Sequence, residues 1–319
     1  MRRVQPASPS KYSDLKRLSL FLVGAMLGAA IFSVPLYLGC QELLKACRIT
    51  AANARSWPMS EVVKADFNRF FDRALLVSVL AGLPFLVRAS RGGPVLPPLR
   101  PDARTMGQTG AGFALAAGLI LVLGWVYCRT GIYELNPKAS WTALGQPLTA
   151  AFGAAIVEEI LFRGFILGLM LRSLGTRTAV FATTFIFAIV HFLKPPEGFA
   201  IPAGEITWHS GFDVIAAIFG RFDSIDFVLA EFFTLFAVGW VAAWARVKTG
   251  SLWPGAGLHA GWVFGLKYFS ALTLTSKALR DGDYLPWIGD NLKVGLVPFV
   301  VVLFTGWLAS LGWQRARRS

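Results

Sequence analysis

Three ionisable side chains interrupt one apolar stretch of this sequence. Between Ala151 and Met170 the residues are almost all apolar, yet the stretch contains Glu158, Glu159 and Arg163. On insertion scales, a charged side chain at the centre of a membrane-spanning helix costs about 3 kcal/mol. A sequence that keeps three such groups so close together indicates a buried polar site, whose chemistry depends on the other groups that it meets.

Two of the histidines fall inside predicted helices and can reach that site. Glu158 lies 14 residues before Arg172, about 21 Å along one helix, and His191 lies 15 residues after Thr176, about 22 Å along the next. A short turn joins these helices, so they are antiparallel neighbours and the two side chains reach a similar depth. His259 is expected about 13 Å from the same side, and helix tilt could close the difference. We therefore expect one carboxylate and two imidazoles to converge below the membrane surface.

The two adjacent glutamates are expected to have different roles. Neighbouring residues of an α-helix point about 100° apart, so Glu158 and Glu159 cannot do the same job. Glu159 and Arg163 have the i,i+4 spacing at which an acid and a base pair, which leaves Glu158 for a polar cavity. There Glu158 can act as a general base, His191 can hold a water molecule and His259 can donate to an oxyanion. Those roles describe hydrolysis of an amide bond, and the alternative is a set of helix-packing hydrogen bonds.

Few other residues of the sequence could take part in chemistry. Glu231 stands at the start of a predicted helix, where a packing or interfacial role competes with a role in the site. His209 lies in a polar connection and is expected to be solvated. Cys40, Cys47 and Cys128 have neither the spacing of a metal site nor that of a disulfide framework.

The composition is that of a membrane protein. Apolar residues make up 55% of the 319 residues and charged residues 15%, whereas soluble domains are about 45–50% apolar and about 25% charged. We predict the all-α class, as a polytopic transmembrane helix bundle. The net charge of +13 does not indicate a nucleic-acid partner, because no basic patch with interleaved aromatic residues accompanies it. Basic ends and loops of a membrane protein account for that charge.

Hydropathy predicts about eight membrane-spanning helices. They are expected near residues 18–44, 73–88, 107–128, 146–172, 176–193, 227–246, 251–270 and 294–313. Segment 89–106, rich in proline and glycine, is expected to be a non-helical linker, and 194–226 could hold a helix lying at the membrane surface. The basic ends favour a multi-pass protein of a cell inner membrane with both termini in the cytoplasm.

The motifs, taken in order, resemble the CAAX-protease and bacteriocin-processing family of intramembrane proteases. The resemblance rests on Glu158-Glu159-x-x-x-Arg163, Phe187-x-x-x-His191 and His259-x-x-x-Val263. It divides the sequence into 1–144, with about three spans and linkers, 145–265, with the catalytic core, and 266–319, with a last span and a basic tail. Where this sequence has Val263 the family usually has asparagine, which is thought to assist the oxyanion side of the site.

The resemblance implies a helical membrane endopeptidase that cleaves a membrane-associated peptide or protein and is surrounded by membrane lipids. Carried over to this sequence, Glu158 would be the base, His191 would position the water and His259 would serve the oxyanion. Glu159, Arg163 and Phe187 would support them. We favour this glutamate mechanism without a metal cofactor; the alternative is zinc bound by Glu158, His191 and His259, a donor set that zinc accepts.

The valine at position 263 leaves a second function open. Loss of one oxyanion donor lowers rates by about 10²–10³ in other proteases, so the protein could instead be a catalytically weak scaffold that binds membrane peptides. A third hypothesis is a transporter with a buried, proton-coupled Glu/His pair. The absence of visible internal repeats argues against that transporter. The sequence does not indicate an oligomeric state.

Overall fold

The chain is mostly helical in the computed structural model, which describes residues 11–50, 52–54, 59–88, 95–195, 198–220, 225–289 and 291–318. The long helices are α1 (Lys11–Ala46), α3 (Phe67–Arg88), α4 (Ala103–Arg129), α5 (Gly145–Glu158), α7 (Thr176–Val190), α9 (Ile225–Thr249), α10 (Trp253–Leu272) and α12 (Leu296–Arg318). The shorter elements are α2 (Met59–Val63), β1 (Tyr133–Leu135), the π-helix η1 (Glu159–Ile166), α6 (Leu167–Ser173), the 3₁₀ turn η2 (Ala203–Glu205), α8 (Ser210–Gly220), β2 (Thr273–Thr275) and α11 (Lys277–Arg280). The all-helical class predicted from the sequence is therefore confirmed.

A helix occupies each of the eight regions where hydropathy predicts one. Three of them are long and apolar enough to cross a membrane, and these are Asp14–Ala46, Ala103–Arg129 and Leu296–Trp313 among the residues described. Helix α7 is apolar but has 15 residues, fewer than the roughly 20 that a hydrocarbon core requires. The membrane character of the chain is clear, and the number of eight spans stays a prediction.

One helix start and one helix interior differ from the sequence prediction for local reasons. Helix α4 begins at Ala103, inside the expected linker, because the Asp102 side chain accepts a hydrogen bond from the Thr105 backbone N–H and so caps the first turn. The part of that linker from 95 to 102 is non-helical as expected, and 89–94 lie outside the described residues. The expected helix 146–172 is interrupted by η1, whose backbone widens to i→i+5 hydrogen bonding.

The described residues form two compact units. The first lies within Met1–Arg91 and Phe192–Asp223, and the second within Gly92–His191 and Ser224–Ser319. All the candidate site residues of the three motifs belong to the second unit. The sequence-based division at 144 and 265 follows the motifs rather than these contacts, and it stays a prediction.

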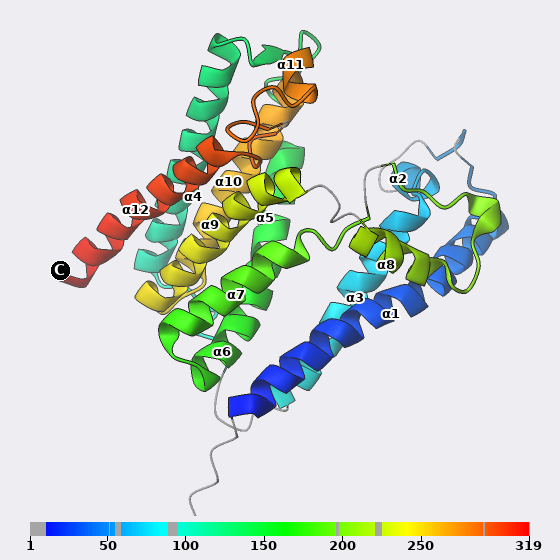
Figure 1. Ribbon diagram of the computed structural model, residues 1–319, viewed down its shortest axis with the longest axis horizontal. Coiled ribbons are helices and arrows are strands. Elements are labelled where there is room, and N and C mark those ends of the chain that lie inside the picture. The colour runs from blue at the N-terminus through cyan, green and yellow to red at the C-terminus, as the bar shows by residue number, and fades with distance from the viewer. Residues whose placement is uncertain are drawn as a thin grey trace, which may run out of the picture. The chain divides into compact units, whose positions relative to one another are not determined.

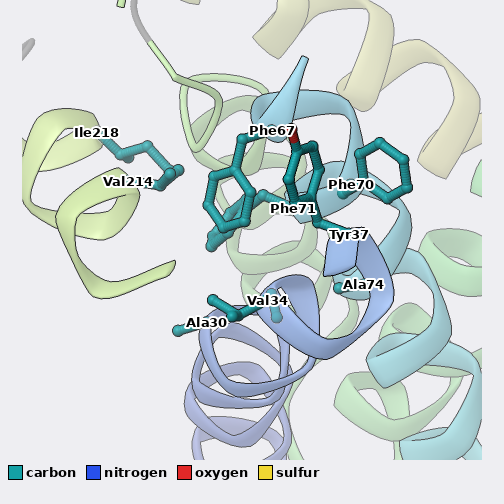
Figure 2. Packing of buried hydrophobic residues seen from close by; sticks show 10 residues of the cluster. Ala30, Val34, Tyr37, Phe67, Phe70, Phe71, Ala74, Val214 and Ile218 are labelled. Atoms are coloured by element: carbon teal, nitrogen blue, oxygen red, sulfur yellow. The ribbon is translucent and has the colours of Figure 1, made fainter. Parts of the chain in front are cut away.

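The first unit has an aromatic core between α1, α3 and α8. Tyr37 of α1 packs edge-on against Phe67 and Phe70 of α3, with ring centroids 5.7 and 5.1 Å apart. Figure 2 shows Val214 and Ile218 of α8 pointing toward this cluster. Helix α8 thus lies in the connection where a surface helix was expected, with one apolar face buried against the unit. Its placement at a membrane surface stays a prediction.

The second unit is a bundle in which α4, α10, α9 and α7 lie side by side and α12 packs on α4 and α9 (Figure 1). Helices α4 and α10 run parallel, and the antiparallel pair of β1 with β2 joins the segments that follow them. Three glycines of α10 face the α4 backbone, namely Gly257, Gly261 and Gly265. A Cβ atom at any of them would overlap α4, so the four-residue glycine spacing permits this close contact.

Candidate active site

Three side chains from three segments of the second unit meet, and the two imidazoles among them approach the same oxygen of the Glu158 carboxylate. Glu158 ends α5, His191 directly follows α7, and His259 lies in α10. Glu158 Oε2 is 3.6 Å from His191 Nε2 and 3.7 Å from His259 Nε2. The side chains of Glu158 and His191 are 28% and 22% exposed, whereas that of His259 is 5% exposed. The structure therefore brings together the three groups singled out from the sequence and leaves two of their side chains partly exposed.

The backbone of α7 fixes the proton on His191. Its Nδ1 atom lies 2.7 Å from the Phe187 carbonyl oxygen, which can only accept a hydrogen bond. Nδ1 therefore carries the hydrogen, and in the neutral ring the lone pair of Nε2 faces Glu158. A separation of 3.6 Å is long for a direct hydrogen bond. Two acceptors at this distance suit a water molecule that donates to both.

Glu159 holds the second imidazole in place. His259 Nδ1 lies 3.0 Å from Glu159 Oε1, and the carboxylate accepts its hydrogen. This contact turns Nε2 of His259 toward Glu158. The i,i+4 spacing predicts the pairing of Glu159 with Arg163 alone, and nothing in the sequence indicates that the same carboxylate also orients His259.

The expected pairing of Glu159 with Arg163 is present and fully enclosed. Arg163 Nη1 lies 3.0 Å from Glu159 Oε1, and each side chain is 1% exposed. Arg163 Nη2 donates a hydrogen bond of 3.2 Å to the carbonyl of Gly239 in α9. The guanidinium also lies over the Phe187 ring, 4.2 Å from its centroid. Three elements thus hold one buried cation, and through it the carboxylate that orients His259.

Phe187 is the aromatic centre of the site. Its ring centroid lies 4.5 Å from that of His191 and 6.0 Å from that of His259. Phe162 of η1 packs edge-on against it at 5.0 Å. A ring in these contacts excludes water behind both imidazoles and limits their rotation. Phe187 therefore lies where the motif places a supporting residue.

The buried ion pair lies within the π-helix. Glu159 is the first residue of η1. Leu167 directly follows the last residue of η1, and its N–H donates to the Phe162 carbonyl five residues earlier. Single π turns inside α-helices are frequent at functional sites. Here the wider turn still allows Glu159 and Arg163 to pair while Glu158 is directed toward both imidazoles. The hydrophobic pattern of 146–172 has no signal that predicts this change in backbone.

Two glycines not predicted from the sequence make room in the site, one for the Glu159 carboxylate and the other for the Phe187 ring. A Cβ atom on Gly255 would lie 3.2 Å from Glu159 Oε2 and 3.3 Å from the Ala242 carbonyl. A Cβ atom on Gly239 would lie 3.0 Å from the Phe187 ring. The repeated glycines on both sides of His259 were the available sequence signal, because such residues mark close helix approach.

A protein-family model matches the part of the chain that contains the candidate site. Residues 140–265 match the family model described as Rce1-like, Type II CAAX prenyl endopeptidase. The segment contains Glu158, His191 and His259, so the resemblance seen in the sequence motifs is confirmed. No curated protein and no solved structure matches the chain.

The family match supports a membrane protease and leaves the roles of individual residues as proposals. Val263, where the CAAX-protease motif usually has asparagine, is partly buried one turn beyond His259 in α10. Its isopropyl group cannot donate a hydrogen bond. This chain therefore lacks, at position 263, the side-chain amide that the CAAX-protease motif usually has.

The arrangement of the donor atoms also bears on the zinc alternative. Within the described part of the chain, no group of three or more His, Cys, Asp or Glu side chains is arranged to hold a metal ion. The donors considered for zinc, Glu158, His191 and His259, face one another at 3.6 and 3.7 Å. A mechanism without a metal cofactor stays a prediction.

The remaining candidates lie away from this constellation. His209 is exposed and pairs with Asp213 at 2.8 Å, as a solvated histidine would. The buried carboxylate of Glu231 pairs with Lys293, which links the start of α9 to the segment before α12. This ion pair gives Glu231 a packing role, which is one of the two roles considered for it from the sequence.

Proposed function

We propose that the protein is an intramembrane endopeptidase in which Glu158 activates water for attack on a peptide bond. The observation that carries this proposal is the position of Glu158 Oε2, within 4 Å of the Nε2 atoms of both His191 and His259. The match of 140–265 to prenyl endopeptidases supports the same reaction class. The substrate is a membrane-associated peptide or protein, and a prenylated C-terminal peptide is the first to test.

In the proposed mechanism, a water molecule lies between Glu158 and His191. Glu158 removes one proton as the water oxygen attacks the amide carbonyl, and the Nε2 lone pair of His191 accepts the other water hydrogen. The carbonyl oxygen becomes an oxyanion, to which His259 donates through a protonated Nε2. Collapse of the tetrahedral species breaks the C–N bond, and the proton held by Glu158 passes to the leaving amine.

The surrounding groups contribute by fixing geometry before the reaction. Glu159 accepts from His259 Nδ1, and the Phe187 carbonyl accepts from His191 Nδ1, so both rings are held with Nε2 toward Glu158. Arg163 balances the charge of Glu159 in an enclosed position. Groups already oriented at the reacting atoms need no rearrangement as charge develops.

A second candidate function follows from Val263. A protein that lacks one oxyanion donor could bind membrane peptides in the same site and release them uncut. This scaffold reading predicts that peptides bind equally well to the protein with and without Glu158, and that no new peptide termini form.

The test is cleavage of a farnesylated CAAX-type reporter and of an unprenylated membrane peptide by the purified chain in proteoliposomes. We expect Glu158→Gln and His191→Ala each to lower the initial rate of cleavage by about 10²–10⁴-fold. His209→Ala, a change at an exposed histidine, is the matched control and should leave the rate unchanged. Equal rates for the wild type and both site variants would rule out the proposed enzyme.

Two additions separate the alternatives. If Val263→Asn raises the cleavage rate by up to about 10²–10³-fold, the valine weakens an active oxyanion site. If neither the wild type nor any variant cleaves the peptide but the peptide still binds, the scaffold hypothesis is favoured. A strong chelator should leave the rate unchanged under the glutamate mechanism, whereas loss of activity with recovery on adding zinc would favour the metal alternative. Comparing peptide termini between a deletion strain and its parent would identify native substrates.

A further inference from the structure

A cavity separate from the candidate active site lies among α4, α10 and α12. Its volume is about 530 Å³, and most of its lining is apolar or small, with Gly112, Leu258, Ala309 and Trp313 among the residues that face it. Arg104 lines it as a charged residue, and Gln108 supplies an amide one turn further along α4. We call this hollow the inter-helix cavity.

The inter-helix cavity lies at one end of the second unit. Helix α4 begins there, while the candidate span Leu296–Trp313 ends there. Gly112 packs against the carbonyl of Pro254, which brings the start of α10 to the same end. The cavity therefore extends from the boundary of two candidate membrane spans into their apolar part.

Helix α10 separates this cavity from the catalytic groups. Leu258 lines the cavity, whereas its neighbour His259 bonds to Glu159 on another face of the helix. Likewise Pro254 lines the cavity and Gly255 lies against the Glu159 carboxylate. A ligand of the inter-helix cavity would thus contact the back of the helix that carries His259, without entering the catalytic site.

The end of the bundle that holds the cavity is basic. Arg100 and Arg104 flank the start of α4, and Arg246 and Lys248 lie in the last turn of α9, which a short connection joins to α10. The nearby acid, Asp102, caps α4, and hydrogen bonds from the Thr105 side chain and backbone hold the pKa of Asp102 below its usual value.

We propose that the inter-helix cavity holds an acyl chain of an anionic phospholipid whose phosphate pairs with Arg104. Basic pockets between transmembrane helices on the cytoplasmic side are suited to anionic head groups, and a guanidinium pairs well with phosphate. The apolar lining offers almost no partners for a peptide backbone, which would lose its hydrogen bonds there. A hydrocarbon chain needs none, so the lining and the single cation favour a lipid.

The experiment is lipid binding to the purified full chain in a neutral detergent, followed by native mass spectrometry and by thermal unfolding. We expect phosphatidylglycerol to bind and to raise the unfolding midpoint more than phosphatidylcholine of the same chains. Inorganic phosphate and glycerol phosphate should do neither. If the water-soluble phosphates protect as well as the lipid, the site is an anion site and the proposal is wrong.

Matched variants locate the site on α4. Arg104→Gln should weaken phosphatidylglycerol binding about fivefold, the effect of roughly 1 kcal/mol per basic residue near anionic lipid. Arg129→Gln, at the exposed opposite end of α4, should leave it unchanged. Ala111→Phe, which fills the cavity, should abolish the preference, whereas Ala114→Phe, exposed and outside the lining, should not.

Two further outcomes would overturn the lipid site. One is equal binding of phosphatidylglycerol and phosphatidylcholine, and the other is an equal loss in the Arg104 and Arg129 variants, which would indicate unspecific attraction to a basic protein. The readout is binding rather than cleavage. It can be repeated in the Glu158→Gln background, so it stands or falls independently of the proposed protease function.

Discussion

The two faces of helix α10 show two different uses of close helix packing. On the face toward α4, Gly257 and Gly261 let two backbones meet without any polar side chain between them. On the other face, Gly255 leaves space for the Glu159 carboxylate, which bonds to His259 one turn later. Small residues therefore serve stability on one face and the placement of buried charges on the other. Substitutions on the two faces should have separable effects.

The largest expected effect on stability comes from breaking the buried ion pair. Arg163→Met leaves Glu159 enclosed with His259 as its remaining polar partner, which should cost about 3–5 kcal/mol. The measurement is unfolding in detergent by heat or denaturant. The double variant Arg163→Met/Glu159→Leu should recover much of the loss, since it leaves no unpaired buried charge. A loss below about 1 kcal/mol in the single variant would mean that the pair is not enclosed.

A change at His259 tests the face of α10 that carries the candidate catalytic groups. His259→Ala should lower the cleavage rate by about 10²–10³-fold, because it removes the proposed oxyanion donor. Its effect on unfolding should be smaller than that of Arg163→Met, since Glu159 retains its arginine. Initial rates corrected for the folded fraction decide the point. If the corrected rate equals that of the wild type, His259 has only a structural role.

The glycine face should respond in stability rather than in chemistry. A Cβ atom at Gly261 would meet the α4 backbone and lie 2.8 Å from the Ala116 side chain, so Gly261→Ala should cost about 1–3 kcal/mol. Gly118→Ala on α4 is the control, because nothing lies within 4 Å of its Cβ position. That control should be neutral or stabilising, as alanine favours helices. Equal midpoints for both variants would argue against tight α4–α10 contact.

The smallest expected effect concerns the aromatic centre of the site. Phe187→Leu removes the ring below Arg163 while keeping an apolar side chain, and should cost about 0.5–2 kcal/mol of cation–π energy. Phe185→Leu on the same helix, where the ring is largely exposed, should change the unfolding midpoint less. If both changes have the same effect, the contact between Arg163 and the ring contributes nothing specific.

Several features of the site were available from the sequence because they depend on distance along a helix. The rise per residue sets how deep Glu158 and His191 lie on two helices joined by a short turn. The i,i+4 spacing predicted the pairing of Glu159 with Arg163. The polar connection predicted an exposed His209. None of these inferences requires knowledge of how far apart non-neighbouring helices pack.

What the sequence determined by itself is the helical membrane class, the polar groups in apolar segments and their motif order. Only the tertiary structure decided that Glu159 orients His259, that the Phe187 carbonyl sets the His191 tautomer, and that a π-helix begins at Glu159. The physical reason is rotational. The periodicity of a helix fixes positions along its axis, whereas which side chains meet depends on how each helix is turned against its neighbours, and long-range packing sets that rotation.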